Sequence, residues 1–140
     1  MFDRLNLRHL RAVAAIVRSG TVSAAAQTVS ISQPAITQGL SKLEAQLGVS
    51  LFDRQPEGMQ PTEAARLLVP RIERAMGHIG NPRVTMAQLR ALLALAEAGS
   101  YARASAVTDL AQPTLHRALG DLAIALRRTL VERRGKGISF

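Results

Sequence analysis

The first apolar stripe of the chain has the period of an amphipathic helix. It comprises Leu7, Leu10, Val13, Ala14 and Val17, which fall on one face at 3.6 residues per turn. Asn6 before the stripe is a favoured N-cap, and Ser19-Gly20 after it supplies a stop. The pattern predicts a helix from about Asn6 to Ser19.

Two further helices are predicted before residue 50. An alanine-rich stretch from Ser23 to Val29 can pack closely against its neighbours, and a longer helix opens at Ser32 after a tight polar turn. Pro34 fits the first turn of that helix, where no amide donor is lost. The apolar seam of the longer helix has i, i+4, i+7, i+11 spacing and consists of Ile36, Leu40, Leu43 and Leu47. A short helix, a turn and a helix with one apolar side predict a helix-turn-helix.

Extended stretches follow the third helix. Leu51-Phe52 and Met59-Gln60 are joined by a segment with a proline and a glycine, which predicts a two-stranded wing. Thr62 then begins another helix that we expect to run to Gly77 with a bend at Pro70. Gly80-Asn81-Pro82 breaks that helix, so a domain boundary is expected there.

The chain repeats itself at an offset of 79 residues, from Leu10 against Leu89 to Gly58 against Gly137. Gln33-Pro34 aligns with Gln112-Pro113, and Thr85 with Gln88 can cap the matching first helix. The second seam consists of Leu115, Leu119, Leu122 and Leu126. The predicted fold is mainly α, with two tandem winged helix-turn-helix domains of three helices plus a two-stranded wing each. The first spans residues 1–61, a linker helix spans 62–81, and the second spans 82–140, truncated after its wing.

Charge and composition narrow the function. The formal net charge is +8, which concentrates polyanions, with nucleic acid first and an anionic membrane surface second. Arginine outnumbers lysine, which suits phosphate and guanine but is also produced by a GC-rich genome. The few aromatic residues argue against single-strand or RNA binding, where bases stack on aromatic rings. Duplex DNA is therefore the favoured partner.

Several classes of protein are disfavoured. There is no cysteine, and His9, His78 and His116 lack the spacing of metal ligands, so we expect neither a metal nor another cofactor. No nucleophile lies beside a base and no glycine-rich phosphate loop is present, so an enzyme is not expected. Without a membrane span or secretion signal, a cytoplasmic location with no membrane partner is expected.

The outward side of the third helix carries the candidate DNA contacts. Gln33 at the helix start can both donate to and accept from an adenine edge, while Ser32 and the free first-turn amides suit a phosphate. The alternative is an ordinary solvated helix surface. The outward residues are Ser32, Gln33, Ala35, Thr37, Gln38, Ser41 and Lys42.

The order of motifs in the first copy is characteristic. Ser32-Gln33-Pro34-Ala35, Leu47-Gly48 with Leu51-Phe52-Asp53-Arg54, and Pro61-Thr62-Glu63-Ala64 follow one another. From about Leu5 to Ile79 the chain resembles the DNA-binding domain of LysR-type transcriptional regulators.

That resemblance implies a winged helix-turn-helix dimer paired through the helix from Thr62. It implies base contacts by Gln33, Pro34, Thr37 and Gln38, and a wing near Arg54 on the DNA backbone or minor groove. Gln38 departs from the arginine frequent at that position in the family, which puts the operator in doubt. A small-molecule effector is expected only if a C-terminal sensor domain lies outside this chain.

The second copy resembles the family more loosely. We expect it to touch DNA through Gln112, Pro113, His116, Arg117 and Arg133, helped by a basic cluster of Arg127, Arg128, Arg134 and Lys136. The alternative is a degenerate copy kept as a dimer interface. Residues 82–140 hold nine basic and four acidic residues, against nine and six in residues 1–81, which favours DNA contact.

Three questions of assembly and function remain open at this point. Ala65, Leu68 and Ile72 form a narrow apolar stripe, from which we expect a homodimer through the linker helix. Phe140 aligns with Pro61, which favours a fragment of a longer regulator over a short two-headed binder. The rival functions are a tandem winged-helix protein-interaction module and a DNA-binding unit of the molybdate-regulator type.

Overall fold

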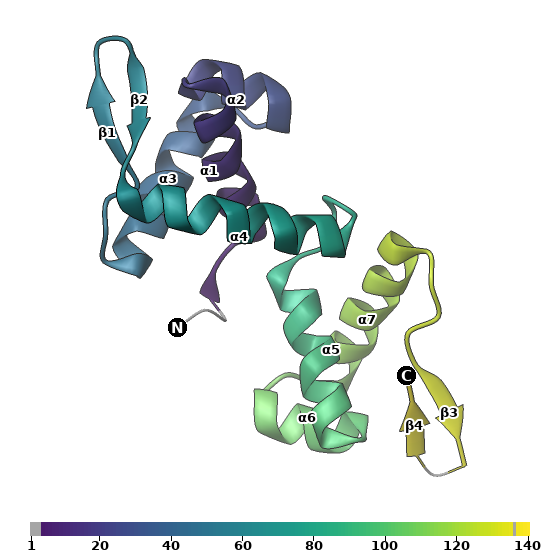
Figure 1. Cartoon of the computed structure of the whole chain (residues 1–140). Coiled ribbons are helices and arrows are strands. Elements are labelled where there is room, and N and C mark those ends of the chain that lie inside the picture. The colour runs from purple at the N-terminus through teal and green to yellow at the C-terminus, as the bar shows by residue number, and fades with distance from the viewer. Residues whose placement is uncertain (1–3, 136) are drawn as a thin grey trace. The chain divides into compact units, whose positions relative to one another are not determined.

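The computed structural model describes residues 4–135 and 137–140. The chain forms two compact units, unit 1 from Met1 to Pro82 and unit 2 from Arg83 to Phe140 (Figure 1). It is mainly helical with two small two-stranded sheets, as the sequence predicts. Within the described residues, no helix has the length and apolar character needed to cross a membrane.

Unit 1 contains four helices and one hairpin among its described residues. In chain order these are α1 (Leu7–Ser19), α2 (Val22–Val29), α3 (Gln33–Leu47), β1 (Phe52–Gln55), β2 (Gly58–Pro61) and α4 (Glu63–Ile79). Each helix begins after a residue whose side-chain oxygen accepts a hydrogen bond from a first-turn amide, which stabilises its start. These N-caps are Asn6, Thr21, Ser32 and Thr62.

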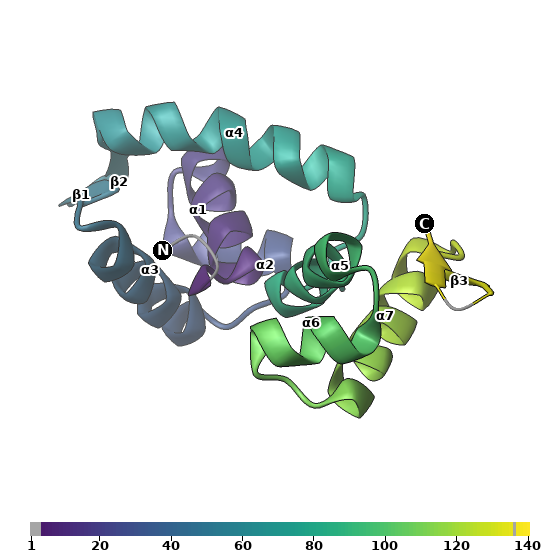
Figure 2. The same cartoon turned by 90° about the horizontal axis from the view of Figure 1, so that it is seen from below.

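Helix α1 lies at the centre of unit 1, with α2 and α3 on one side and α4 across another (Figures 1 and 2). The core includes fully buried Val13 and Ile16 of α1 and Leu51 before the hairpin. The predicted seam of α3 points into this core. Ile36, Leu40 and Leu43 are buried, and Leu47 is half-buried at the helix end.

Helix α4 covers most of its predicted apolar stripe within the chain. Ala65 and Ile72 are buried, together with Val69, in the face that packs on α1. The stripe of Ala65, Leu68 and Ile72 is therefore largely covered within the chain and does not itself require a second subunit. The helix continues through Pro70 and ends at Ile79, two residues beyond the predicted Gly77, because Gly80 takes the left-handed C-cap conformation.

Unit 2 repeats the order of the first five elements of unit 1. It contains α5 (Met86–Ala98), α6 (Tyr101–Thr108), α7 (Gln112–Leu126), β3 (Glu132–Arg134) and β4 (Gly137–Ser139). The predicted capping box of Thr85 and Gln88 is present. Leu115, Leu119 and Leu122 of the second seam are buried, and Leu126 is half-buried. Each unit therefore has its own leucine-lined core.

Two helix ends in unit 2 differ from their counterparts. Ala111 precedes α7 without a side-chain cap, whereas Ser32 caps α3. Arg127 follows α7 with φ 52°, the left-handed conformation that Gly48 adopts after α3. A side chain in that conformation costs about 1 kcal/mol relative to glycine. Both replacements make the ends of α7 less favourable than those of α3.

Candidate nucleic-acid interface

The helix-turn-helix of unit 1 is formed by α2, the turn around Ile31 and α3. Ser30 ends α2 in the left-handed region at φ 53°, and the Ser32 hydroxyl accepts a hydrogen bond from the Ala35 amide at 3.3 Å. Fully buried Ala25 on α2 has no bulk beyond its methyl group, so α2 and α3 can approach closely. These contacts fix the direction in which α3 leaves the turn.

The predicted DNA contacts on α3 lie on its outer side. Gln33, Pro34 and Gln38 are exposed, Thr37 is half-buried, and these four residues line one shallow, open concavity. Ser41 and Lys42 are exposed further along the helix and do not line it. Ser32 lies at the helix start, where its hydroxyl serves as the cap. The structure thus brings together the uncharged polar residues that can recognise base edges.

Arg54 lies on a separate element, wing 1, which is the hairpin of β1 and β2. The hairpin is antiparallel and pairs Arg54 with Met59, and the Arg54 side chain is exposed. Wing 1 runs along the side of unit 1, from the start of α4 to the turn between α1 and α2 (Figure 1). An exposed guanidinium on this hairpin is chemically suited to a phosphate contact.

Three hydrogen bonds that the sequence pattern does not predict hold wing 1. The Met59 amide donates to the carbonyl of Gly20 at 3.0 Å, and the Leu51 amide donates to the Glu44 carboxylate at 2.6 Å. The Thr62 hydroxyl donates to the carbonyl of Ser50 at 2.8 Å. Gly58 approaches Gly20, in the turn between α1 and α2, so closely that an added Cβ would lie 2.6 Å from the Gly20 oxygen.

A contact between α1 and α3 was also missed. Gly39 is buried in the middle of α3, and a Cβ added there would lie 2.6 Å from Cδ2 of His9. Burial, followed by the charges of Lys42 and Arg8, lowers the pKa of His9. The imidazole is therefore favoured in its neutral form as it packs against α3. In the sequence, a glycine inside a predicted helix where no turn requires one is the signal that points to such a close contact.

The predicted contacts of unit 2 are exposed but arranged differently. Gln112, Pro113, His116 and Arg117 are exposed on α7, and Arg133 is exposed on β3. The ring of His116 stacks on Tyr101, with centroids 3.6 Å apart and planes at 16°. Burial raises the pKa of Tyr101, and the Arg133 charge opposes that rise. His116 and Arg133 therefore both interact with one aromatic side chain.

Wing 2, the hairpin of β3 and β4, lacks the attachments of wing 1. Ala123 stands where Glu44 stands in unit 1, so the carboxylate that accepts from the Leu51 amide has no counterpart at that position for Leu130. Among the described residues, no backbone hydrogen bond joins β4 to Gly99. Arg127, Arg128 and Arg134 of the basic cluster are exposed, whereas Lys136 lies outside the described residues.

The chain has clear relatives among bacterial regulators. The family model of bacterial regulatory helix-turn-helix proteins of the lysR family matches residues 7–66 and again residues 86–140. The small neutral protease regulatory protein of Streptomyces coelicolor is 43% identical over 65 residues, covering 46% of this chain and 21% of the relative. The carbapenem-hydrolyzing beta-lactamase transcriptional activator of Serratia marcescens is 36% identical over 104 residues, covering 73% of this chain and 36% of the relative.

A solved structure is also similar to this chain. The crystal structure of the CbnR DNA-binding domain in complex with DNA is 34% identical to this chain and superimposes with a TM-score of 0.51. It matches 53% of this chain and 85% of that domain. The chain thus corresponds to only part of its full-length relatives and to most of an isolated DNA-binding domain. With both of its segments matched by the family model, the chain belongs to the lysR family of bacterial regulatory helix-turn-helix proteins.

Proposed function

We propose that this protein is a sequence-specific regulator that binds duplex DNA with α3 in the major groove. The observation that carries the proposal is the outer side of α3, where Gln33, Thr37 and Gln38 share one open concavity. Amide and hydroxyl groups in that position can pair with base edges. The net charge of +8 supplies the general attraction to phosphate.

The organisation that fits this function is two tandem winged helix-turn-helix domains, residues 1–61 and 82–140, with residues 62–81 as the linker helix. Unit 1 carries the capped α3 and the anchored wing 1. Unit 2 carries the uncapped α7 and the less attached wing 2. Unit 1 is therefore the part that reads sequence.

The proposed regulator forms a homodimer through α4, but not through the apolar stripe that the sequence suggests. Since Ala65 and Ile72 already pack on α1, the pairing surface is the opposite side of the helix, where Leu67 is 58% exposed. An exposed leucine beside arginines such as Arg71 is compatible with a small helix-helix interface. A small-molecule effector is part of the proposal only if a C-terminal sensor domain exists outside this chain.

Unit 2 contributes phosphate contacts without base reading. The His116 ring is stacked on Tyr101, and Arg117 and Arg133 are exposed cations that attract any DNA sequence. Gln112 and Pro113 keep the helix start of the first copy. The two units therefore have unequal roles on one DNA molecule.

The experiment compares Gln33→Ala with Gln112→Ala. A preferred duplex is first selected from a random pool with the wild-type chain, and both variants are then measured on that duplex and on a scrambled one. Gln33→Ala costs about 1–3 kcal/mol on the preferred duplex and little on the scrambled one. Gln112→Ala weakens both duplexes slightly and equally. A larger specific loss from Gln112→Ala would assign base reading to unit 2, and absence of duplex binding by the wild type would refute the proposed function.

A further inference from the structure

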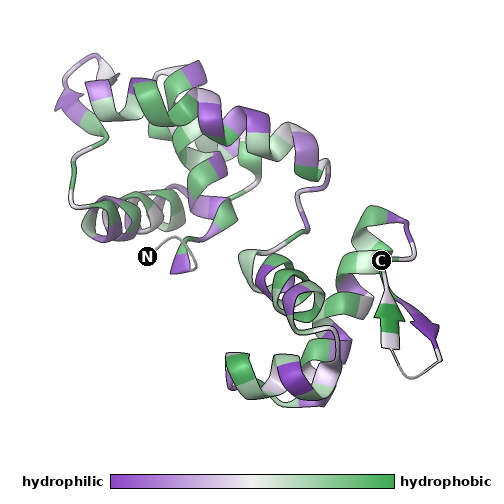
Figure 3. Cartoon of the chain, turned by 60° about the horizontal axis from the view of Figure 1, so that its bottom comes forward, coloured by the Kyte–Doolittle hydropathy of each residue, from purple (hydrophilic) through white to green (hydrophobic). Residues whose placement is uncertain are grey.

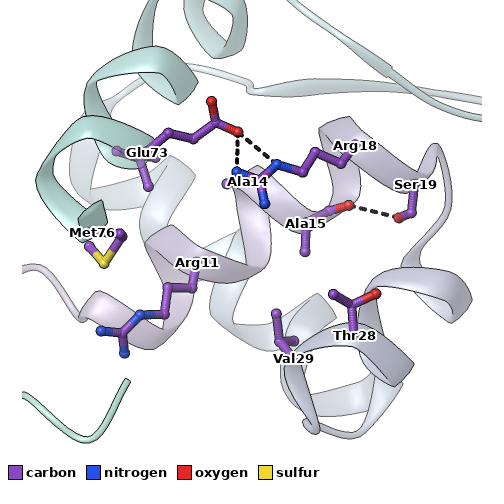
Figure 4. Close-up of a pocket in the computed structure, with 10 residues that line it drawn as sticks. Arg11, Ala14, Ala15, Arg18, Ser19, Thr28, Val29, Glu73 and Met76 are labelled. Carbon is purple, nitrogen blue, oxygen red and sulfur yellow. Dashed lines mark hydrogen bonds and ion pairs between the residues drawn. The ribbon is translucent and has the colours of Figure 1, made fainter. Parts of the chain in front are cut away.

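Unit 1 contains a cavity that none of the predicted DNA contacts lines. It lies between α1, α2 and α4 and has a volume of about 450 Å³, which is within the range of protein pockets that bind small molecules. Figure 4 shows the side chains around this space, with Arg18 on α1 facing Glu73 on α4 and with Val29 on α2. Three helices of one compact unit therefore form its walls.

Aliphatic side chains form the apolar part of this cavity. In the second copy, Leu93 stands at the position of Ala14, so the alanine of unit 1 leaves room that a leucine would fill. Hydropathy colouring shows hydrophobic residues beside hydrophilic ones along the helices of unit 1 (Figure 3). A hydrocarbon group in the cavity would release water from the apolar walls, which favours binding. Those walls are lined by Ala14, Ala15, Val29, Ile72 and Met76.

An ion pair between α1 and α4 borders the cavity. Nε and Nη2 of Arg18 both donate to Oε1 of Glu73, at 2.8 Å and 2.6 Å (Figure 4). The two opposite charges offset each other at this distance. The hydroxyl of Ser19, which also lines the cavity, donates to the carbonyl of Ala15 at 2.7 Å. These groups therefore favour neither an anion nor a cation as a ligand.

The remaining charged residue that lines the cavity is Arg11. Its half-buried guanidinium donates through Nη1 to the carbonyl of Pro82 at 2.6 Å and through Nη2 to that of Asn81 at 3.1 Å. Within the described residues it forms no ion pair. Burial lowers the pKa of Arg11, because the cation has lost water that no anion replaces. Since a guanidinium has more N–H donors than these two bonds use, Arg11 can still bind a carboxylate.

We propose that this cavity binds a small monocarboxylate with a compact hydrocarbon body. The carboxylate pairs with the guanidinium of Arg11, and the hydrocarbon packs against Ala14, Ile72 and Met76. The charge of Arg11 selects an anion over a neutral or cationic molecule of the same shape, and the aliphatic walls favour alkyl groups. The site lies inside unit 1, so it requires no sensor domain. Because the ligand contacts α1 and α4 together, its binding also stabilises unit 1.

The probe is cyclohexanecarboxylate, and the matched control is cyclohexylmethanol, which has the same carbon skeleton without the charge. The titration is followed by the methyl NMR signals of the full 140-residue chain, with Ala14, Ile72 and Met76 as reporters of the cavity. Both molecules shift these signals saturably, and the carboxylate binds at least about tenfold more tightly, the gain expected of a charge-assisted hydrogen bond. The methyl signals of Leu115 and Leu122 in the core of unit 2 stay in place.

Substitutions test the charge and the cavity separately. Arg11→Gln lowers the affinity for the carboxylate to that for the alcohol and leaves the affinity for the alcohol unchanged. Ala14→Leu weakens both molecules at least about tenfold, because the leucine side chain occupies their place. Thr28→Leu, at an exposed position that also lines the cavity, does the same and serves as the second filling variant if circular dichroism shows that Ala14→Leu disturbs the fold.

The matched control is Ala75→Leu, at an exposed position of α4 outside the cavity, which leaves both affinities unchanged. Equal affinities of the wild type for the carboxylate and the alcohol would overturn the proposal. A preference for the carboxylate that survives Arg11→Gln, binding that ignores both filling variants, or no saturable shift of the cavity signals would overturn it as well.

Discussion

The contact between His9 and Gly39 yields a quantitative test of how α1 is joined to α3. In Gly39→Ala, the new Cβ would lie 2.6 Å from Cδ2, 3.0 Å from Nε2 and 3.1 Å from Cγ of His9. Carbon atoms in contact prefer about 3.5–4 Å. Because Cγ is close to the backbone of His9, the ring cannot avoid the methyl group by a small shift of its tip. The imidazole has to leave its place on α3.

Two opposing effects set the size of the change. Alanine stabilises a helix interior by about 1 kcal/mol relative to glycine, whereas forcing an extra methyl group into a packed contact costs about 1–3 kcal/mol. Gly39→Ala alone is therefore expected to destabilise unit 1 by up to about 2 kcal/mol. In a His9→Gln background the clash is relieved, and the same substitution stabilises by up to about 1 kcal/mol. Unit 2 already has this combination, Gln88 with Ala118.

The assay is a double-mutant cycle of the wild type, both single variants and the double variant. Hydrogen exchange of the α1 and α3 amides in increasing urea reports on unit 1, while the fluorescence of Tyr101, the single tyrosine, follows unit 2 as an internal control. A coupling free energy of about 1–3 kcal/mol is expected between the two positions. Effects that add to within about 0.5 kcal/mol would refute it.

Three other predictions follow from the wings and from His9. Gly58→Ala should destabilise unit 1 by about 1–3 kcal/mol in thermal unfolding, because Gly58 has φ 138° and its Cβ would lie 2.6 Å from a backbone oxygen. In Gly137→Ala the nearest atom is a backbone oxygen at 3.8 Å, an ordinary van der Waals contact, so stability should change by less than about 0.5 kcal/mol. Arg54→Ala and Arg133→Ala should each lower the slope of log affinity against log salt by about one, and an unchanged slope would exclude a phosphate contact. Because the pKa of His9 is lowered below 6.5, the unfolded chain binds the proton first, so unit 1 should lose stability as the pH falls through about 6.5. His9→Gln should flatten that loss in urea titrations, and an identical pH profile would contradict it.

Local signals in the sequence accounted for most element boundaries. Asn6 and Thr85 cap the first helix of each copy and Gly20 ends α1, as predicted. Gly99 ends α5 in the same left-handed conformation. Such signals act over a few residues and so can be read from a sequence. The predicted end of α4 at Gly77 is two residues too early, because Gly80 is the residue that caps the helix.

Contacts between distant residues were harder to foresee. The burial of Ala65 and Ile72 on α1 and the packing of His9 on Gly39 depend on how helices are arranged in space. An apolar stripe identifies a face to be covered, but it does not say which helix covers it. The predicted contacts on α3, in contrast, lie on one helix. The helical period alone places them on its outer surface.

The weak attachment of wing 2 has a consequence for how unit 2 can change over generations. Since neither a glutamate at the Glu44 position nor a bond to Gly99 holds it, opening the hairpin leaves the core of α5, α6 and α7 intact. Substitutions or insertions from Val131 onward therefore remove little of the folding free energy of the unit. This hairpin is the part of the duplicated domain most free to acquire a new length or a new charge without loss of the fold.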